Sequence, residues 1–263
     1  MAQAASMTAT SRRRWRRPPA WLARLGVIAG LLALWEFAAA RGYVSAFIAP
    51  PPSQIAASFE MLFVQEGLAG AFLRTFAEAL AAASIGSALG IGAGYLLHRY
   101  KMAGRAYSDW VAAMASAPLV LLYPIFLVIF GRNSATIVAM GVVGCLPPII
   151  LKAKEGFDGV RPALINVGRS YGLQGWRMFS MIQFPAALPT VFSGVRIGLL
   201  FAIINVVGVE YLIVFGGLGQ LISDLGDRFE IAGMYAGILF VVLVSVCFFF
   251  ITEQIEKWLL SSK

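Results

Sequence analysis

Charged residues are scarce in this 263-residue sequence: Asp, Glu, Lys and Arg together make up 13%, whereas hydrophobic residues make up 59%. Soluble domains are typically about 25% charged and about 45–50% apolar. A composition so far from that average excludes an ordinary soluble domain and predicts an integral membrane protein.

The sequence also lacks the residues that several kinds of site require. It contains no G-x-x-x-x-G-K-[ST] loop that could cradle nucleotide phosphates, so we expect that this chain does not itself drive transport with ATP. Its single histidine, His98, excludes an H-E-x-x-H zinc site, and its two cysteines, Cys145 and Cys247, lie in apolar stretches without metal-site spacing. We therefore expect no catalytic residue, no metal and no bound cofactor, and interpret His98 as a cation at a helix C-terminus.

Long apolar stretches supply the about 20 residues that each membrane span needs. Two of the predicted spans contain one acid each, Glu36 in residues 25–40 and Glu210 in residues 197–223. The other four have no charged residue and cover residues 79–97, 110–131, 133–151 and 231–252. The predicted fold class is an all-α polytopic membrane protein with six transmembrane helices.

The basic residues are distributed unevenly between the two sides of these spans. Seventeen of the 21 Lys and Arg residues fall on the side of the termini and of the fourth-to-fifth loop. The positive-inside rule therefore makes both termini cytoplasmic, and the net charge of +8 indicates orientation and lipid contact rather than nucleic-acid binding. Residues 1–20 contain no acid and resemble a basic tail at an anionic lipid surface, with a transit peptide as the alternative.

A polar segment at residues 166–189, between two apolar runs, is the most informative part of the sequence. Pro162 is suited to the first position of a short helix, and Gly172 can end that helix with a positive φ. A second, amphipathic helix is expected at residues 174–183, because apolar side chains recur there every three residues. Pro185 and Pro189 are expected to stop it and to start the next span.

This segment resembles the "EAA" loop of permease subunits of ATP-binding-cassette importers. Gly172 lies six residues after Asn166, Trp176 follows at the usual place, and residues 184–189, Phe-Pro-Ala-Ala-Leu-Pro, match the closing pattern of the loop. The Glu-Ala-Ala itself is replaced by Asn-Val-Gly at residues 166–168. Trp35-Glu36-Phe37 and the run Pro-Pro-Pro-Ser-Gln-Ile at residues 50–55 are similar to the opening of the nitrate, sulfonate, taurine and bicarbonate branch.

The resemblance implies a type I importer (MetI-like) permease fold in a bacterial inner membrane, and a transport subunit rather than an enzyme. Implied partners are ATPase subunits that use ATP and Mg, a second permease copy or homologue, and an extracytoplasmic solute-binding protein. The loop, about residues 152–189, would contact the ATPase, with Trp176, Met178 and Phe179 in a cleft of that partner; a solvated loop with an interfacial helix is the alternative. The residues assigned to this coupling loop are Asn166, Gly168, Gly172, Leu173, Trp176, Arg177, Met178, Phe179, Pro185 and Pro189.

The resemblance also suggests domain boundaries. Residues 1–20 would form the cytoplasmic tail, and residues 21–69 the first helix with a Pro-rich outer segment. Residues 70–257 would form the type I transmembrane domain of five helices, and residues 258–263 a cytoplasmic tail. Trp258 is suited to the headgroup zone.

Within the spans, small and polar residues mark further candidates. Gly86, Gly90 and Gly94 form a stripe that lets another helix approach closely, either in this chain or in a second subunit. Glu210 precedes a Gly-Gly-Leu-Gly run at residues 216–219, and either bonds to these glycine amides or has a role in transport.

Four prolines lie in the third and fourth spans and should kink or break them: Pro118, Pro124, Pro147 and Pro148. Tyr123, Phe126 and Phe130 lie beside these breaks and either line a substrate pathway or pack in the helix bundle.

Two other classes of function fit the composition. An ion-gradient-driven secondary transporter should have paired ionisable residues at mid-membrane and an inverted repeat, whereas only Glu36 and Glu210 are available here. A membrane scaffold without transport activity would have the same composition, and only the loop motif distinguishes it from a permease subunit. For the substrate, the resemblance implies a small, often anionic solute such as nitrate, taurine or an alkanesulfonate, with a thiamine precursor or another vitamin as the alternative.

Overall fold

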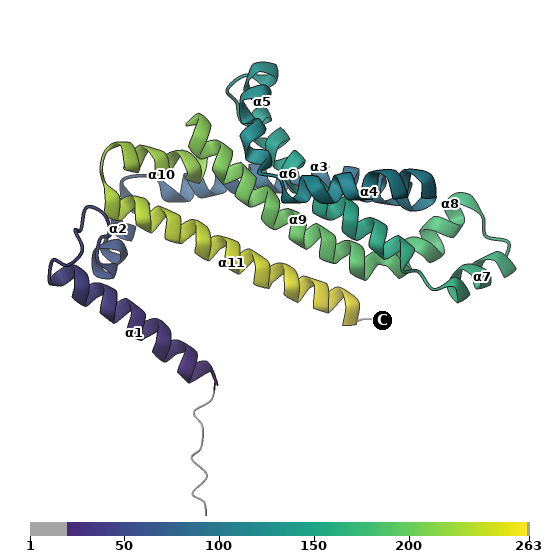
Figure 1. The fold of residues 1–263 in the computed structure, drawn as a ribbon, viewed down its shortest axis with the longest axis horizontal. Coiled ribbons are helices and arrows are strands. Elements are labelled where there is room, and N and C mark those ends of the chain that lie inside the picture. The colour runs from purple at the N-terminus through teal and green to yellow at the C-terminus, as the bar shows by residue number, and fades with distance from the viewer. Residues whose placement is uncertain (1–19, 262–263) are drawn as a thin grey trace, which may run out of the picture. The chain divides into compact units, whose positions relative to one another are not determined.

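The computed structural model describes residues 20–261, and all regular structure within that range is helical, as predicted (Figure 1). Residues 1–19 of the predicted basic tail, and the side chain of Trp258, lie outside the described residues and side chains. The main helices are α1 (Ala20–Ala40), α2 (Pro52–Val64), α3 (Leu68–Arg99), α4 (Lys101–Ser116), α5 (Tyr123–Phe130), α6 (Ser134–Asp158), α7 (Pro162–Ser170), α8 (Gly175–Met178), α9 (Phe184–Ile213), α10 (Gly217–Asp227) and α11 (Ile231–Ser261). A 3₁₀ turn, Leu119–Leu122, precedes α5, and a π-helical turn, Phe179–Gln183, joins α8 to α9.

Five helical stretches of the described chain are long and apolar enough to cross a membrane. A bent pair, Lys101–Ser116 with Leu119–Phe130, makes the number six if it counts as one span. The five stretches are Leu22–Ala40, Leu68–Arg99, Ser134–Asp158, Gly175–Ile213 and Ile231–Lys257.

The third predicted span, residues 110–131, is not one straight helix. Its two helical parts meet at an angle of 91°. Ala117, which precedes Pro118, has the extended backbone (ψ 144°) that a proline imposes on its neighbour, and Pro118 has no N–H to continue the helix. The predicted break is therefore present at Pro118, whereas α6 runs through Pro147 and Pro148 without one.

Two further boundaries differ from the prediction. The predicted fifth span, residues 197–223, is divided between α9 and α10, because Val214, Gly216 and Gly217 all have positive φ and reverse the chain. The loop expected before residue 110 is nearly absent, since only Tyr100 separates α3 from α4.

The chain divides into two compact units after Ser53. In the first unit, the carboxylate of Glu36 on α1 accepts hydrogen bonds from the backbone N–H (3.0 Å) and the hydroxyl (2.7 Å) of Ser53. Ser53 lies in the first turn of α2, where free amide groups stabilise a negative charge. This contact accounts for an acid within an apolar helix, and joins the two halves of the Trp-Glu-Phe and Pro-Pro-Pro-Ser pattern.

In the second unit, α3, α6 and α9 pack against one another and form the centre of the bundle. Their shared core contains Met140 and Cys145 from α6 and Val206 from α9. Helix α10 packs on α9 and α3, and α11 packs on α9 and α10 (Figure 1). The stripe of Gly86, Gly90 and Gly94 faces α6 of the same chain, close to Cys145, Ile149 and Ala153.

Replacing Gly94 by Ala should destabilise the bundle. A Cβ there would lie 2.6 Å from the Ala153 Cβ and 2.8 Å from the backbone oxygen of Ile150, so α3 and α6 would have to separate. We expect a loss of about 1–3 kcal/mol in the free energy of unfolding, measured by thermal unfolding in detergent. Gly92→Ala is the matched control, because nothing lies within 4 Å of its Cβ position and Ala favours the helix by about 1 kcal/mol. Equal stability of the two variants would contradict the packing.

Candidate functional site

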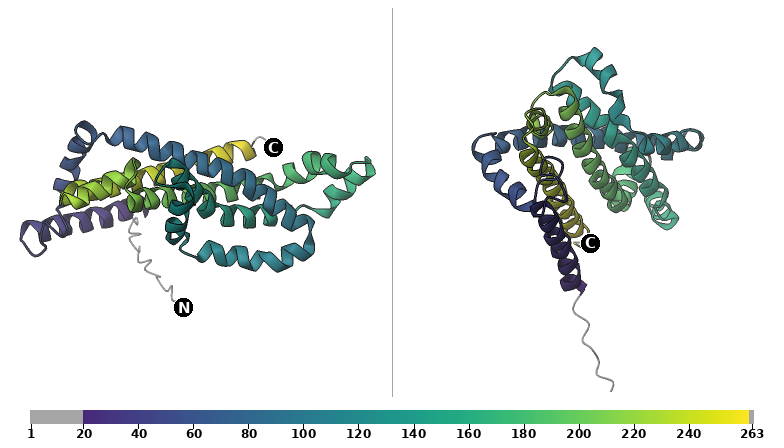
Figure 2. Two further views of the ribbon diagram at one scale, coloured as in Figure 1. Left: turned by 90° about the horizontal axis from the view of Figure 1, so that it is seen from above. Right: turned by 60° about the vertical axis from the view of Figure 1, so that its left-hand side comes forward.

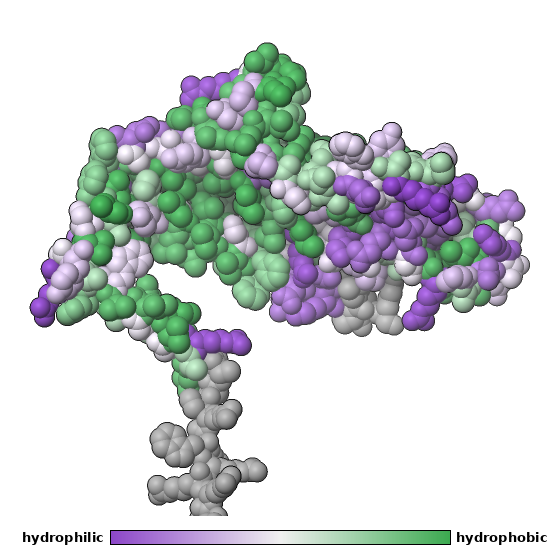
Figure 3. Space-filling view, in the orientation of Figure 1, coloured by the Kyte–Doolittle hydropathy of each residue, from purple (hydrophilic) through white to green (hydrophobic). Residues whose placement is uncertain are grey.

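Helices α7 and α8 project beyond the ends of α6 and α9 (Figures 1 and 2). Figure 3 shows hydrophilic residues gathered at this end of the unit. Of the loop predicted at about residues 152–189, the part between α6 and α9 is residues 159–183, and we call this part the coupling loop, since it contains most of the residues assigned to ATPase contact from the sequence. The structure brings these residues together at one end of the bundle.

The turn between α7 and α8 has the geometry predicted from Gly172. Helix α7 begins at Pro162, and Gly172 has a φ of 72°. The N–H of Gly172 donates to the Arg169 oxygen and that of Leu173 donates to the Gly168 oxygen, at 2.9 Å each. This pair of bonds is a Schellman motif, which satisfies the last carbonyls of a helix.

Replacing Gly172 by Val should strain this turn without creating a steric clash. Nothing lies within 4 Å of a Cβ at this position, but a left-handed backbone costs a non-Gly residue about 1–2 kcal/mol. We expect a chain that still inserts but loses most of its transport, measured as membrane level and solute uptake. Gly172→Asn, which tolerates this backbone better, should retain more uptake; equal uptake for Val, Asn and Gly would contradict the need for this turn.

The coupling loop is anchored to the bundle by aromatic side chains. The Phe179 ring contacts the rings of Tyr95 on α3 (4.5 Å between centroids), Phe157 on α6 (5.8 Å) and Phe184 on α9 (5.7 Å). A displacement of α8 would therefore be transmitted to three spanning helices. A π-helical turn such as Phe179–Gln183 is often found at functional sites.

The expectation that Met178 enters a partner's cleft is wrong. Met178 is 8% exposed and packs against Gly168, whose Cβ position lies 2.9 Å from the methionine sulfur. Phe179 is half-buried in the aromatic contacts above. Met178 and Phe179 therefore pack against other parts of the same chain and attach the loop to it. Trp176, by contrast, is 75% exposed.

The outer face of the coupling loop exposes large apolar side chains at the hydrophilic end of the unit. We call Leu164, Val167, Tyr171 and Trp176 the loop surface; Tyr171 is 81% exposed. Only Trp176 was assigned a contact role from the sequence. The spacing of Leu164, Val167 and Tyr171 by three and four residues was the signal for the others, since such residues share a helix face.

Exposed polar residues lie between or beside these apolar residues in the sequence of the loop. Asn166, Arg169 and Arg177 are all exposed on the loop. Ser170 lies within Gly-Arg-Ser-Tyr-Gly, which has the spacing of a nucleophile elbow, but it follows a helix and its hydroxyl donates to the Asn166 oxygen (3.0 Å). An elbow requires a strand before the serine, so this pattern has no catalytic geometry.

Pro185 and Pro189 do not bound the second helix of the loop, contrary to the prediction. The helical segment from Gly175 to Ile213 is continuous through both prolines. Pro185 falls in the first turn of α9, just after the wider π turn. Pro189 removes one backbone bond inside α9, but Ala187 and Val191 beside it are buried, and this packing maintains the helix.

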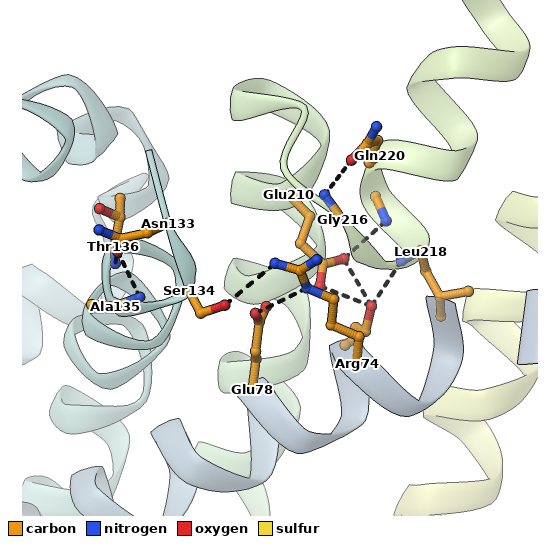
Figure 4. A network of polar contacts seen from close by, with 12 residues as sticks. Arg74, Glu78, Asn133, Ser134, Ala135, Thr136, Glu210, Gly216, Leu218 and Gln220 are labelled. Atoms are coloured by element: carbon orange, nitrogen blue, oxygen red, sulfur yellow. Dashed lines mark hydrogen bonds and ion pairs between the residues drawn. The ribbon is translucent and has the colours of Figure 1, made fainter. Parts of the chain in front are cut away.

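Glu210, at the other end of α9, is completely buried and belongs to a hydrogen-bonded network (Figure 4). Its carboxylate accepts bonds from the Thr75 hydroxyl (2.8 and 2.9 Å) and from the Gly219 N–H (2.9 Å). The Thr75 oxygen accepts from the Leu218 N–H (2.8 Å). The acid therefore joins α3 and α9 to the N-terminus of α10, which supports the structural role among the two interpretations.

Arg74 extends this network toward α6. Its guanidinium lies 3.4 Å from the Glu78 carboxylate and 3.4 Å from the Ser134 hydroxyl, and 4.7 Å from the centre of the Phe215 ring. From the sequence alone, Arg74 was only one of the basic residues whose distribution predicts the orientation in the membrane. Its contacts link the beginning of α6 to the turn before α10.

A cavity of about 320 Å³ lies beside the break in the bent pair. Pro118, Phe201 and Asn205 line it, and the Asn205 amide donates to the Phe201 oxygen (2.9 Å). Asn205 was missed, although a lone amide in an apolar run was its signal. Tyr123 and Phe126 pack instead against the hydrophobic core.

Phe130 stacks on Phe126 at 6.1 Å between ring centroids. None of the three aromatic residues proposed for the pathway lines the cavity at the break. Their role in a pathway stays a prediction, and Phe201 and Asn205 are added to the candidates.

Residues 86–261 match the family model described as "Binding-protein-dependent transport system inner membrane component". The permease protein SsuC of Bacillus subtilis (strain 168), named for aliphatic sulfonates transport, is 25% identical over 229 residues, which cover 87% of this chain and 83% of the relative. The formylaminopyrimidine transport permease protein ThiX of Halalkalibacterium halodurans is 27% identical over 234 residues, 88% of this chain and 91% of the relative.

Among solved structures, a chain of the MetNI methionine ABC transporter in an inward-facing conformation is similar in fold. It has a TM-score of 0.63 and 20% identity, and the alignment covers 75% of this chain and 97% of that one. The fold is thus that of a MetI-type importer permease.

Proposed function

Because the chain belongs to the family of binding-protein-dependent transport system inner membrane components, we propose that it forms the membrane pathway of an importer and is driven by a separate ATPase through the coupling loop. Such a transport subunit carries no catalytic residue of its own. ATP and Mg are used by the partner, and no cofactor binds this chain.

The observation that carries this proposal is the loop surface. Large apolar side chains exposed to water are costly, and a patch of them framed by arginines is suited to a protein partner. Trp176 and Tyr171 are the residue types that most often dominate the binding energy of an interface. The partner surface should therefore offer an apolar cleft with an acidic rim.

The distribution of charge supports a cytoplasmic coupling loop. The loop and the adjoining helix ends contain Lys152, Lys154, Arg161, Arg169 and Arg177, and the positive-inside rule assigns such a segment to the cytoplasm. Both termini then face the cytoplasm, an ATPase can reach the loop, and a binding protein delivers solute at the outer face. A second copy or a homologous chain completes the pathway.

For the substrate we favour a small sulfonate-like anion. The sequence pattern around Glu36 and the similarity to SsuC both point to this class. ThiX, named for formylaminopyrimidine, aligns over a similar share of the chain, so a vitamin precursor is the second candidate.

Reconstitution in lipid vesicles tests the proposed function. The chain, its ATPase and its binding protein should together accumulate solute when ATP is supplied, and omission of the ATPase should abolish uptake. Uptake by the chain alone along an ion gradient would indicate a secondary transporter, and no uptake under any condition would favour a scaffold.

A further inference from the structure

A second cavity, of about 520 Å³, lies between the end of α3 and the coupling loop. Tyr95 and Arg99 line it from α3, Arg169 from α7, and Gln174 and Gln183 from the segments on either side of α8. Hydrogen-bond donors from three parts of the chain thus face one volume. The volume is within the about 300–1,000 Å³ typical of small-molecule sites.

The two arginines of this cavity have no acidic partner in the described chain. No carboxylate lines the cavity, and the described residues make no ion pair or side-chain hydrogen bond with Arg99 or Arg169. The nearby acids of α6 are engaged elsewhere: Glu155 pairs with Lys152 (2.8 Å), and Asp158 pairs with His98 (2.6 Å) and Lys154 (2.8 Å).

The one remaining acid in residues 90–200, Asp109, lines a different cavity with Lys101 and Arg105. Two like charges at one cavity repel each other, and an anion between them would offset that repulsion. The side chains of Gln174 and Gln183 also have no hydrogen-bond partner among the described residues, so their amides are free to complete the coordination of a ligand.

We propose that this cavity binds a small oxyanion of the phosphate or sulfonate class. Guanidinium groups present paired N–H donors that match the oxygens of such anions. Ile165, Leu173 and the buried Met178 also line the cavity, and these apolar side chains suit a short alkyl group better than a second charge.

An anion in this cavity would connect α3 to α7. Because the coupling loop would then be attached to the bundle by an additional contact, cytoplasmic solute should slow its movement and reduce ATP hydrolysis. This consequence rests on the proposed function of the loop, whereas the binding itself does not.

Calorimetric titration of the full-length chain in nanodiscs tests the binding, with ethanesulfonate and inorganic phosphate as probes. Arg99→Gln and Arg169→Gln should each weaken binding at least tenfold. Arg161→Gln is the matched control, because it removes the same charge from the same loop without lining the cavity. Melting temperatures equal to that of the parent chain establish that the variants are folded.

Two lipid compositions distinguish a free anion from an anionic lipid headgroup. In nanodiscs of zwitterionic phosphatidylcholine alone the free probes should bind. If phosphatidylglycerol weakens probe binding to the parent chain but does not change the residual binding to the Arg99→Gln and Arg169→Gln variants, an anionic lipid headgroup competes for the same site. Absence of binding in phosphatidylcholine, or equal loss in all three arginine variants, overturns the proposal. If the chain binds the probes but no ATPase associates with it, the coupling function fails while the anion site stands.

Discussion

Trp176→Ala should abolish ATP-dependent uptake while the chain remains folded in the membrane. The side chain is 75% exposed in this chain, and its ring contacts the ring of Phe179 (5.1 Å between centroids), so its removal loses one aromatic contact and little buried packing. If it enters a cleft of the ATPase, truncation should cost about 2 kcal/mol or more of binding free energy, about a 30-fold weaker complex. Uptake into vesicles and co-purification of the ATPase measure the two effects.

Trp110→Ala is the matched control for this variant. Trp110 is 72% exposed and lies on α4, so it is a similarly exposed tryptophan that is not part of the coupling loop. It should leave ATPase co-purification unchanged. Normal co-purification and uptake in Trp176→Ala, or equal losses in both variants, would contradict the assignment of the loop surface.

Glu210→Ala should be among the most destabilising single substitutions in the described chain. It leaves the Gly219 N–H and the Thr75 hydroxyl buried without their acceptor, at a cost of about 1–3 kcal/mol for each group. Thermal unfolding in detergent should show this loss, and hydrogen exchange should accelerate at the first amides of α10.

Two further variants separate this role from a simple loss of charge. Glu210→Gln keeps an acceptor for Gly219 and should lose less stability than Glu210→Ala. Glu60→Ala removes an exposed acid of α2 and should leave stability unchanged. A stable Glu210→Ala variant that fails only in transport would instead place Glu210 in the pathway.

The fold class and the turn at Gly172 could be predicted from the sequence because each has a strong local cause. Apolar runs predict membrane spans directly. A positive φ at position 172 could be expected because glycine is the residue type that adopts this backbone conformation without strain. Continuity of the helix through Pro185 and Pro189 could not be predicted, because it depends on the packing of Ala187 and Val191 and on a π turn.

The division of roles within the loop also depends on tertiary structure. Met178 and Trp176 are two residues apart and similarly apolar, but one faces Gly168 and the other faces outward. The cavity between α3 and the loop unites Arg99 and Arg169, which are 70 positions apart in the sequence. No local pattern contains such a pairing, so only the folded chain reveals it.

Photo-crosslinking from the loop surface tests most directly whether this loop is where a separate ATPase acts. A photoreactive amino acid at position 176 should capture the ATPase subunit in native membranes, whereas the same group at position 128, where Val128 of α5 is 87% exposed, should not. Absence of an ATPase adduct from position 176, or equal capture from both positions, would contradict this account.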